Sequence, residues 1–199
     1  AITQRTPRGL VINEDISNHG HIRDSRYDIP SAMVAVTQVD YRHHFSGEQI
    51  QDANIAWTEQ TDTNVTVVKD TEDFKAGGAS LRLLTDTNSG TVASGDILTS
   101  HAISSLDLRG YDAVEFWMKS STATSAGNIT LCLSSAANLG TIVETLAVPA
   151  LSARTWTYCR VSLATPEKDD AIISVGLKYA TTGARYIWIN DIKAVATES

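Results

Sequence analysis

Short segments in which apolar and polar residues alternate recur along most of this chain, and they constrain its fold more than any other feature. Such alternation places successive side chains on opposite faces of a β-strand. Glycines that favour turns separate the segments at intervals of roughly a dozen residues; they are Gly77, Gly78, Gly90, Gly110, Gly127, Gly140 and Gly183. Many short strands at this spacing predict an antiparallel sandwich or barrel.

The alternating segments also predict where the strands lie. We expect strands at 65–69, 79–85, 113–120, 128–134, 141–148, 156–163, 172–179 and 186–195, and the short apolar run Met33–Val36 is a further candidate. No stretch longer than a turn or two has helical spacing, and no segment repeats another. Serine and threonine are unusually common and proline is scarce, which also favours strands over helices.

Alternation within these segments predicts a buried set of side chains between two sheets. The expected core residues are Phe116, Leu131, Leu133, Val161, Leu163, Val175, Leu177, Ile187 and Ile189. The same pattern points Cys132 outward and Cys159 inward. Cysteines on opposite faces do not form a disulfide, and two reduced thiols indicate an intracellular origin.

The first 45 residues differ from the rest of the chain. They carry five arginines and five acidic residues, so the net charge of −7 lies entirely in residues 46–199. The first 30 residues show neither strand nor helix spacing of their apolar residues. We therefore expect an extended N-terminal arm at 1–45 that lies along another surface, and a β-sandwich domain at 46–199; a frayed terminus is the alternative. The candidate contact residues of the arm are Arg5, Arg8, Leu10, Ile12, Ile16, Ile22, Arg23 and Arg26.

Charge and hydropathy exclude several classes of protein. A net charge of −7 leaves no basic patch for nucleic acid. No apolar run approaches the roughly 20 residues of a membrane span, and we expect no signal peptide. With two cysteines, the chain is not a disulfide scaffold.

Catalytic and metal-binding motifs are missing from the sequence, which predicts a protein that is not an enzyme and has no cofactor. There is no nucleophile elbow, no zinc-protease helix motif and no phosphate-binding glycine loop. The histidines, at His19, His21, His43, His44 and His101, would need further converging ligands to hold a metal, and ordinary hydrogen bonds are expected of them. The carboxylate pairs Glu72–Asp73 and Asp169–Asp170 lie in expected loops, where solvent exposure rather than glycosidase chemistry is predicted.

Three large aromatic residues occupy polar positions of the expected strands. Trp117 alternates with apolar neighbours, and Tyr186 and Trp188 lie opposite Ile187 and Ile189. Large aromatic side chains on an outward face usually contact a partner. That partner is a sugar, a protein subunit or the chain's own arm, and Trp117, Tyr186 and Trp188 are the candidate contact residues in the sandwich.

Several segments of the chain resemble a known group of domains. These are 77–83 (GGASLRL), 106–120 (LDLRGYDAVEFWMKS), 155–163 (TWTYCRVSL), 173–179 (ISVGLKY) and 186–192 (YIWINDI). In this order they resemble the jelly-roll sandwiches of carbohydrate-binding modules and galactose-binding-like domains. The resemblance implies an all-β antiparallel jelly-roll β-sandwich. Domains of this kind often hold a structural calcium near the last strand, where Asp191 matches an acidic position. Asn190 replaces a frequent acid and the supporting ligands from the first strand are not identifiable, so no metal is expected here.

A jelly-roll domain joined to a polar arm is also similar to virion proteins of tailed bacteriophages, and size and arm are most like those of a capsid decoration, or cement, protein. This resemblance implies a structural virion protein that binds the major capsid protein or other virion subunits, forms a homo-oligomer and is assembled in the host cytoplasm. The alternative is a carbohydrate-binding module or a host-glycan-recognition domain, with a glycan as partner. No membrane or nucleic-acid partner is expected on either interpretation.

Overall fold

The computed structural model describes residues 47–59, 64–86 and 90–196. Within these ranges the chain forms strands β1 (Glu48–Gln51), β2 (Thr58–Glu59), β3 (Val65–Asp70), β4 (Ser80–Thr85), β5 (Ile97–Leu106), β6 (Ala113–Ser120), β7 (Ile129–Ser134), β8 (Ile142–Ala147), β9 (Thr157–Ser162), β10 (Ile172–Tyr179) and β11 (Tyr186–Val195), with the 3-10 helices η2 (Ala137–Leu139) and η3 (Pro166–Lys168). In this part of the chain, no helix is long and apolar enough to cross a membrane. The predicted arm and the run Met33–Val36 lie outside the described residues.

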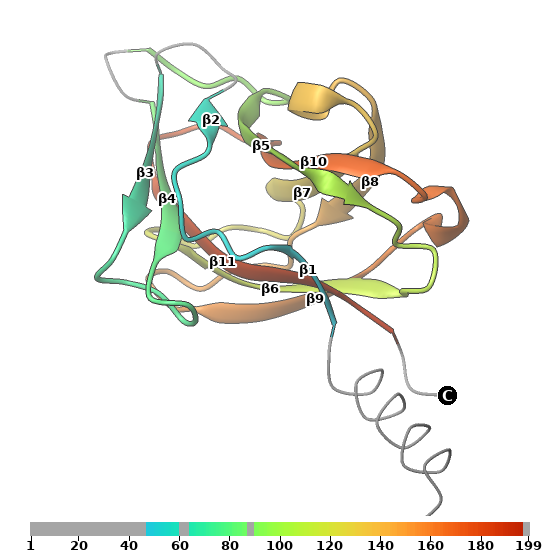
Figure 1. The fold of residues 1–199 in the computed structure, drawn as a ribbon. Helices are drawn as coiled ribbons and strands as arrows, with labels where there is room; N and C mark the ends of the chain where they lie inside the picture. The colour runs from blue at the N-terminus through green and yellow to red at the C-terminus, as the bar shows by residue number, and fades with distance from the viewer. Residues whose placement is uncertain (1–46, 60–63, 87–89, 197–199) are drawn as a thin grey trace, which may run out of the picture. The chain divides into compact units, whose positions relative to one another are not determined.

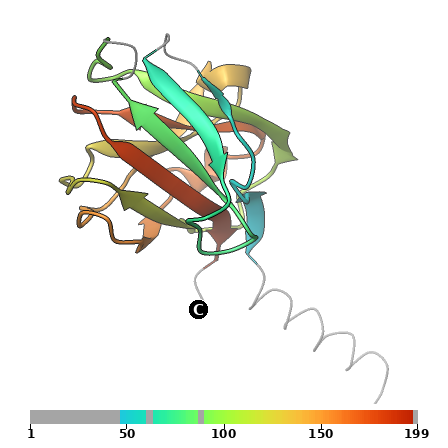
Figure 2. The same ribbon diagram turned by 90° about the vertical axis from the view of Figure 1, so that its left-hand side faces the viewer.

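The strands form two antiparallel sheets that pack face to face (Figure 1, Figure 2). Sheet A has the order β3-β4-β11-β6-β9, with β1 also paired to β11, and sheet B has the order β2-β5-β10-β7-β8. The long strand β11 pairs with β6 along one edge, while its other edge is shared between β4 and β1. The predicted all-β antiparallel jelly-roll sandwich is confirmed.

Eight expected strands agree with the structure to within one residue at each end, but three strands of the described chain were not expected. β1 and β2 are too short to show alternation. The ten-residue β5 was not predicted, because serine and histidine occupy positions at which an alternating pattern would have apolar residues. β5 nevertheless lies between β2 and β10 in sheet B, because pairing with β10 satisfies its backbone whatever its side chains are.

The hydrophobic core lies between the sheets and contains eight of the nine predicted residues. Leu131, Val175 and Ile187 are fully buried, and Leu163 is nearly so. Val161 is the exception: it is only half-buried and packs against the edge of the core. It lies on β9, which is the edge strand of sheet A, so one side of its side chain has no neighbouring strand.

The two cysteines are free, and both are buried. Cys159, on β9, belongs to the core, and burial raises the pKa of its thiol to about 12. Cys132, on β7, is paired with Gly176. It lies on the face of sheet B that points away from the core, as alternation predicts. This outward position is nevertheless buried.

The outer face of sheet B is partly covered by η2. Leu139 of this helix is buried against β10, where a Cβ atom on Gly176 would lie only 2.7 Å from Leu139 Cδ1 and 2.4 Å from the carbonyl oxygen of Thr99. Glycine at position 176 therefore allows the β7–β8 connection to lie close to the sheet. Alternation within a strand cannot reveal such a cover, because the covering segment comes from a loop.

Candidate binding face

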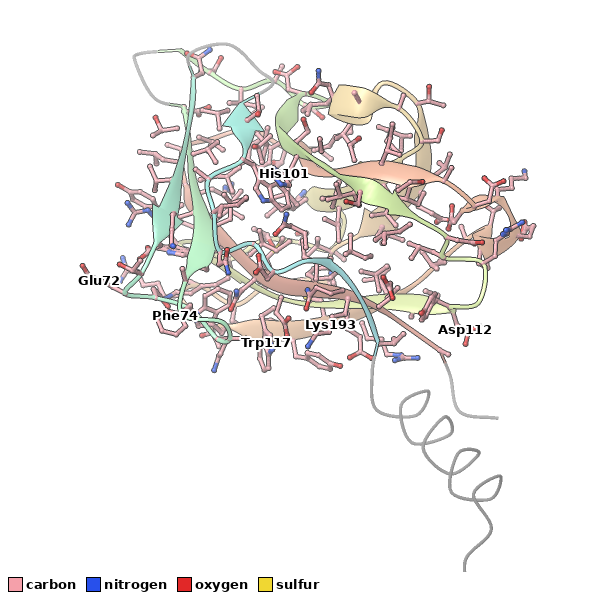
Figure 3. All side chains as sticks on the ribbon, viewed as in Figure 1. Glu72, Phe74, His101, Asp112, Trp117 and Lys193 are labelled. Atoms are coloured by element: carbon pink, nitrogen blue, oxygen red, sulfur yellow. The ribbon has the colours of Figure 1, made fainter. Side chains whose placement is uncertain are left out.

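The outer side of sheet A carries the largest group of aromatic side chains in the described chain, and we call it the aromatic face. Trp117 on β6 lies opposite Tyr158 on β9, with ring centres 5.2 Å apart. Tyr186 and Trp188 follow each other on the same side of β11, with ring centres 5.8 Å apart. Figure 3 shows Trp117 on the side of sheet A that faces away from sheet B. Two pairs of rings are therefore presented together on one sheet surface.

Asp70, at the end of β3, fixes the β11 side of this face. Its carboxylate accepts hydrogen bonds from the Trp188 indole nitrogen at 2.9 Å and from Arg82 at 3.1 Å. It also accepts the backbone N–H groups of Glu72 and Asp73, which begin the β3–β4 loop. Burial raises the pKa of Asp70, but these hydrogen bonds and the Arg82 charge together hold it below its ordinary value. Asp70 is thus an ionised anchor for Trp188.

The β3–β4 loop, residues 71–79, reaches over the β6 side of the face. Asp73 accepts a hydrogen bond from the Trp156 indole nitrogen at 2.7 Å and forms an ion pair with Lys119. Lys75 holds its ammonium group 5.0 Å from the centre of the Trp117 ring. Asp73 lies in a loop, as expected, and 33% of its side chain is exposed, but its carboxylate also binds the Trp156 and Lys119 side chains.

Lys119 contacts two tryptophan rings in this region, Trp188 and Trp156. Its ammonium group lies 4.8 Å from the ring centre of Trp188 and 5.9 Å from that of Trp156. Arg82 lies in the same way 5.6 Å from the ring centre of Tyr186. Cations placed over aromatic rings are attracted to their π faces, so these side chains hold the rings in fixed positions.

A charged group lies at the β9 edge of the face. Glu115 accepts a hydrogen bond from the Tyr158 hydroxyl and pairs with Arg160. Burial first, and then the neighbouring Glu115, raise the pKa of Tyr158 to about 12. The Tyr158 ring itself is 51% exposed, so its position is fixed while its surface stays accessible.

The structure brings together the three sandwich residues that alternation singled out. Trp117, Tyr186 and Trp188 all lie on the aromatic face; Tyr186 is 40% exposed, and the two tryptophans are half-buried under neighbouring side chains. Sequence reasoning missed the remaining members. Alternation with the inward Cys159 could have found Tyr158, but no spacing rule predicts that Asp70 and Asp73 bind indole nitrogens.

The opposite side of the sandwich offers no comparable surface. Tyr179 is the one phenylalanine, tyrosine or tryptophan in the strands of sheet B as described, and it belongs to the core. The outer positions of β5, β7 and β10 carry small side chains such as Ser100, Cys132 and Ser174, all of them buried. Stacking on an aromatic ring is therefore available on sheet A and not on the described strands of sheet B.

Two acidic side chains are buried near the 3-10 helix η3. Glu144 on β8 accepts hydrogen bonds from the backbone N–H groups of Ala164 and Thr165 and from the Thr165 hydroxyl. Asp169 is fully buried, and neither of its carboxylate oxygens has a hydrogen-bond partner among the described residues. Burial, and then the negative charges of Glu144, Glu167 and Asp170, raise the pKa of Asp169 to about 6. The prediction of a solvated loop is wrong for Asp169.

A polar pocket of about 340 Å³ opens beside β1 and β5. His101 lines it together with Gln49, Gln51 and Ser104. Figure 3 shows His101 between the two sheets, and its ring stacks on that of Trp57 at 5.9 Å. Burial lowers the pKa of His101 despite the opposing charge of Asp52. The other four histidines lie outside the described residues.

A structural calcium does not fit the residues near the last strand. No group of three histidine, cysteine, aspartate or glutamate side chains in the described ranges could hold a metal ion. Asp191 forms an ion pair with Lys193 at 2.9 Å. The Asn190 amide nitrogen donates hydrogen bonds to the carbonyl oxygens of Asp52 and Ala79. A hydrogen-bond donor therefore lies where a cation would need an oxygen.

Comparison with known proteins gives matches at the level of structure. No protein-family model matches the sequence, and no curated protein matches it. A family 11 carbohydrate-binding module from Clostridium thermocellum, solved in complex with a β-1,3-1,4-mixed-linked tetrasaccharide, is 13% identical, with a TM-score of 0.52 over 75% of this chain and 95% of that chain. A family 11 module of a cellulosomal cellulase of Clostridium thermocellum is 12% identical, with a TM-score of 0.50 over 76% of this chain and 95% of that chain. At this identity the likeness establishes the fold.

Proposed function

We propose that this chain is a carbohydrate-binding module that holds a glycan against the aromatic face of sheet A. The observation that carries the proposal is the presence of two ring pairs, Trp117 with Tyr158 and Tyr186 with Trp188, on one sheet surface. The C–H faces of sugar rings pack on aromatic rings, while sugar hydroxyls need hydrogen-bond partners near the ring edges. Both kinds of group are present here. The structural likeness to carbohydrate-binding modules supports the proposal.

The charged side chains of the face supply the polar contacts and keep the rings rigid. Asp70 and Asp73 hold indole nitrogens, and Arg82 and Lys119 lie over ring faces. A surface that is already fixed loses little conformational freedom when it binds, so more of the contact energy appears as affinity. This function needs no catalytic group.

The prediction of a capsid decoration protein rests on the sequence resemblance. The arm that would bind the major capsid protein lies outside the described residues, and assembly in a virion and homo-oligomer formation stay predictions. The structural comparison favours the alternative, a glycan partner, because the solved structures that this chain resembles are carbohydrate-binding modules.

The proposal is tested by measuring how the full chain binds a panel of soluble polysaccharides. Affinity electrophoresis and calorimetry give the affinities. Tyr158→Ala combined with Tyr186→Ala removes the two most exposed rings of the face and should weaken binding by about 2 kcal/mol or more. Tyr158→Phe combined with Tyr186→Phe keeps the rings and should retain most of the affinity.

Ile55→Ala supplies the control, because Ile55 is 41% exposed and lies outside the aromatic face. It should bind as the unaltered protein does. Equal affinity in the double alanine variant and the unaltered protein would show that the glycan binds elsewhere. If the unaltered protein binds none of the polysaccharides, the proposal is wrong.

A further inference from the structure

The side chain of Asn190 connects three segments that are far apart in sequence. It lies on β11, is 1% exposed, and makes four hydrogen bonds. Its Oδ1 accepts the backbone N–H groups of Lys75 at 2.8 Å and Ala76 at 2.7 Å. Its Nδ2 donates to the carbonyl oxygens of Asp52 at 3.0 Å and Ala79 at 2.9 Å. The amide therefore uses all of its hydrogen-bonding capacity inside the protein.

Backbone irregularity places this side chain between the loops. The register between β11 and β6 shifts after Asn190, and Asp191 has a φ of 58°. The backbone N–H of Asp191 turns toward the β1–β2 connection, where it donates to the Asp52 carbonyl at 3.1 Å. The Asp52 carbonyl thus accepts two hydrogen bonds, which occupy both of its lone pairs.

Backbone carbonyl oxygens are among the oxygen ligands that calcium takes in proteins. Here the carbonyl oxygens of Asp52 and Ala79 converge on the amide nitrogen of Asn190, and each receives one of its two N–H groups. A neutral side chain thereby joins the two carbonyl oxygens, in addition to the Asp191 N–H that the Asp52 carbonyl already accepts. The contact geometry requires no ion.

We propose that the Asn190 amide takes the place of a bound divalent cation, so that the loops beside the aromatic face keep their positions without a metal. The hydrogen bonds of Asn190 to the β3–β4 loop matter for the aromatic face, because this loop carries Asp73 and Lys75. Asp73 contacts Trp156, and Lys75 contacts Trp117. The proposal concerns how the loops are held, and it stands whether or not the ligand is a glycan.

Asn190→Asp reverses this chemistry with almost no change in shape. One carboxylate oxygen still accepts the N–H groups of the β3–β4 loop. The other faces the carbonyl oxygens of Asp52 and Ala79 with no proton between them. Three acceptors then point to one place, an arrangement that only a proton or a cation relieves. The variant should therefore require calcium where the unaltered protein does not.

Thermal unfolding in excess EDTA and in excess calcium chloride measures this requirement. The unaltered protein should have the same Tm in both. Asn190→Asp should lose on the order of 5 °C or more in EDTA, as expected for a buried unpaired charge, and recover much of the loss in calcium. Asn128→Asp is the matched control, because it adds the same charge at a partly exposed side chain, which accepts the Ser125 N–H.

Two further measurements keep the proposal testable if Asn190→Asp fails to fold. Titration of the unaltered protein with terbium should give no tryptophan-sensitised emission at stoichiometric metal. Asn190→Ala should unfold at a lower Tm that calcium does not restore. Terbium emission from the unaltered protein, a Tm of that protein that depends on calcium, rescue of Asn190→Ala by calcium, or an Asn190→Asp variant indifferent to calcium would each overturn the proposal.

Discussion

The indole nitrogen of Trp188 donates a hydrogen bond to the carboxylate of Asp70, with 2.9 Å between the two atoms. Trp188 is on β11 and Asp70 is on β3, and these strands are separated by β4. Arg82 on the intervening β4 binds the same carboxylate at 3.1 Å. One acidic side chain therefore ties together the outer surfaces of three strands and fixes the orientation of a ring on the aromatic face.

Asp70→Asn should destabilise the protein by about 1–3 kcal/mol, because an uncharged amide leaves hydrogen-bond donors of this group unpaired. Urea unfolding measures the change. Since the pKa of Asp70 is lowered in the folded state, its contribution is present above the ordinary carboxylate pKa and is lost as the pH falls through the folded value. The unfolding free energy of Asp70→Asn should therefore lack this contribution that is lost in acid. Asp107→Asn, at an exposed ion pair, is the control and should unfold as the unaltered protein does.

Lys75→Ala should uncover one face of the Trp117 ring. The ammonium group of Lys75 lies 5.0 Å from that ring centre, and no other cation is placed over Trp117 in the described part of the chain. Quenching of tryptophan fluorescence by acrylamide should increase in this variant. Lys178→Ala, on the other sheet, should leave quenching unchanged. Equal quenching in all three proteins would contradict the contact.

Leu131→Ala should cost about 2–5 kcal/mol of unfolding free energy, because it creates a cavity between the two sheets. Leu131 is fully buried on β7 and is paired with Leu177 of β10. Thr145→Ala, at an exposed position of the neighbouring β8, provides the comparison and should have little effect. A loss below about 1 kcal/mol at Leu131 would place the strand in a register shifted by one residue.

Asp169→Asn should stabilise the protein at neutral pH by about 1–3 kcal/mol, because it removes a buried carboxylate that has no donor among the described residues. The pKa of Asp169 is raised to about 6, so the folded state holds its proton more tightly than the unfolded chain does. Stability from this group is therefore present at low pH and is lost as the pH rises through about 6. Urea unfolding between pH 4 and pH 7 should show this slope in the unaltered protein and not in Asp169→Asn. The same slope in both proteins would contradict the assignment.

Removal of residues 1–30 should leave the sandwich folded, because core residues supplied by the described chain lie between Ile50 and Ala194. The Tm should change by no more than a few degrees. If the virion prediction is correct, the same deletion should abolish association with capsid subunits, as measured by co-sedimentation. Normal association of the shortened chain would rule out the arm as the contact.

The sequence by itself determined eight of the described strands and the faces of their side chains. Alternation in β6 and β11 is a local property, because neighbouring side chains on an extended backbone must point to opposite sides. For this reason the core positions Phe116 and Ile189 and the outward positions Trp117 and Trp188 were all predicted correctly. The resemblance of the strand order to jelly-roll modules added the architecture of two sheets.

The tertiary structure alone decided what covers each face. Cys132 points outward and is still buried, and Asp169 lies in a loop and is still buried. The hydrogen bonds of Asp70 to Trp188 and of Asn190 to Asp52 join residues separated by more than a hundred positions. No local pattern encodes such contacts, because they depend on which loops the packing of the two sheets brings together. Most of the strands can therefore be predicted from the alternation of apolar and polar residues. The aromatic face, in contrast, is completed by loops that only the folded sandwich places beside it.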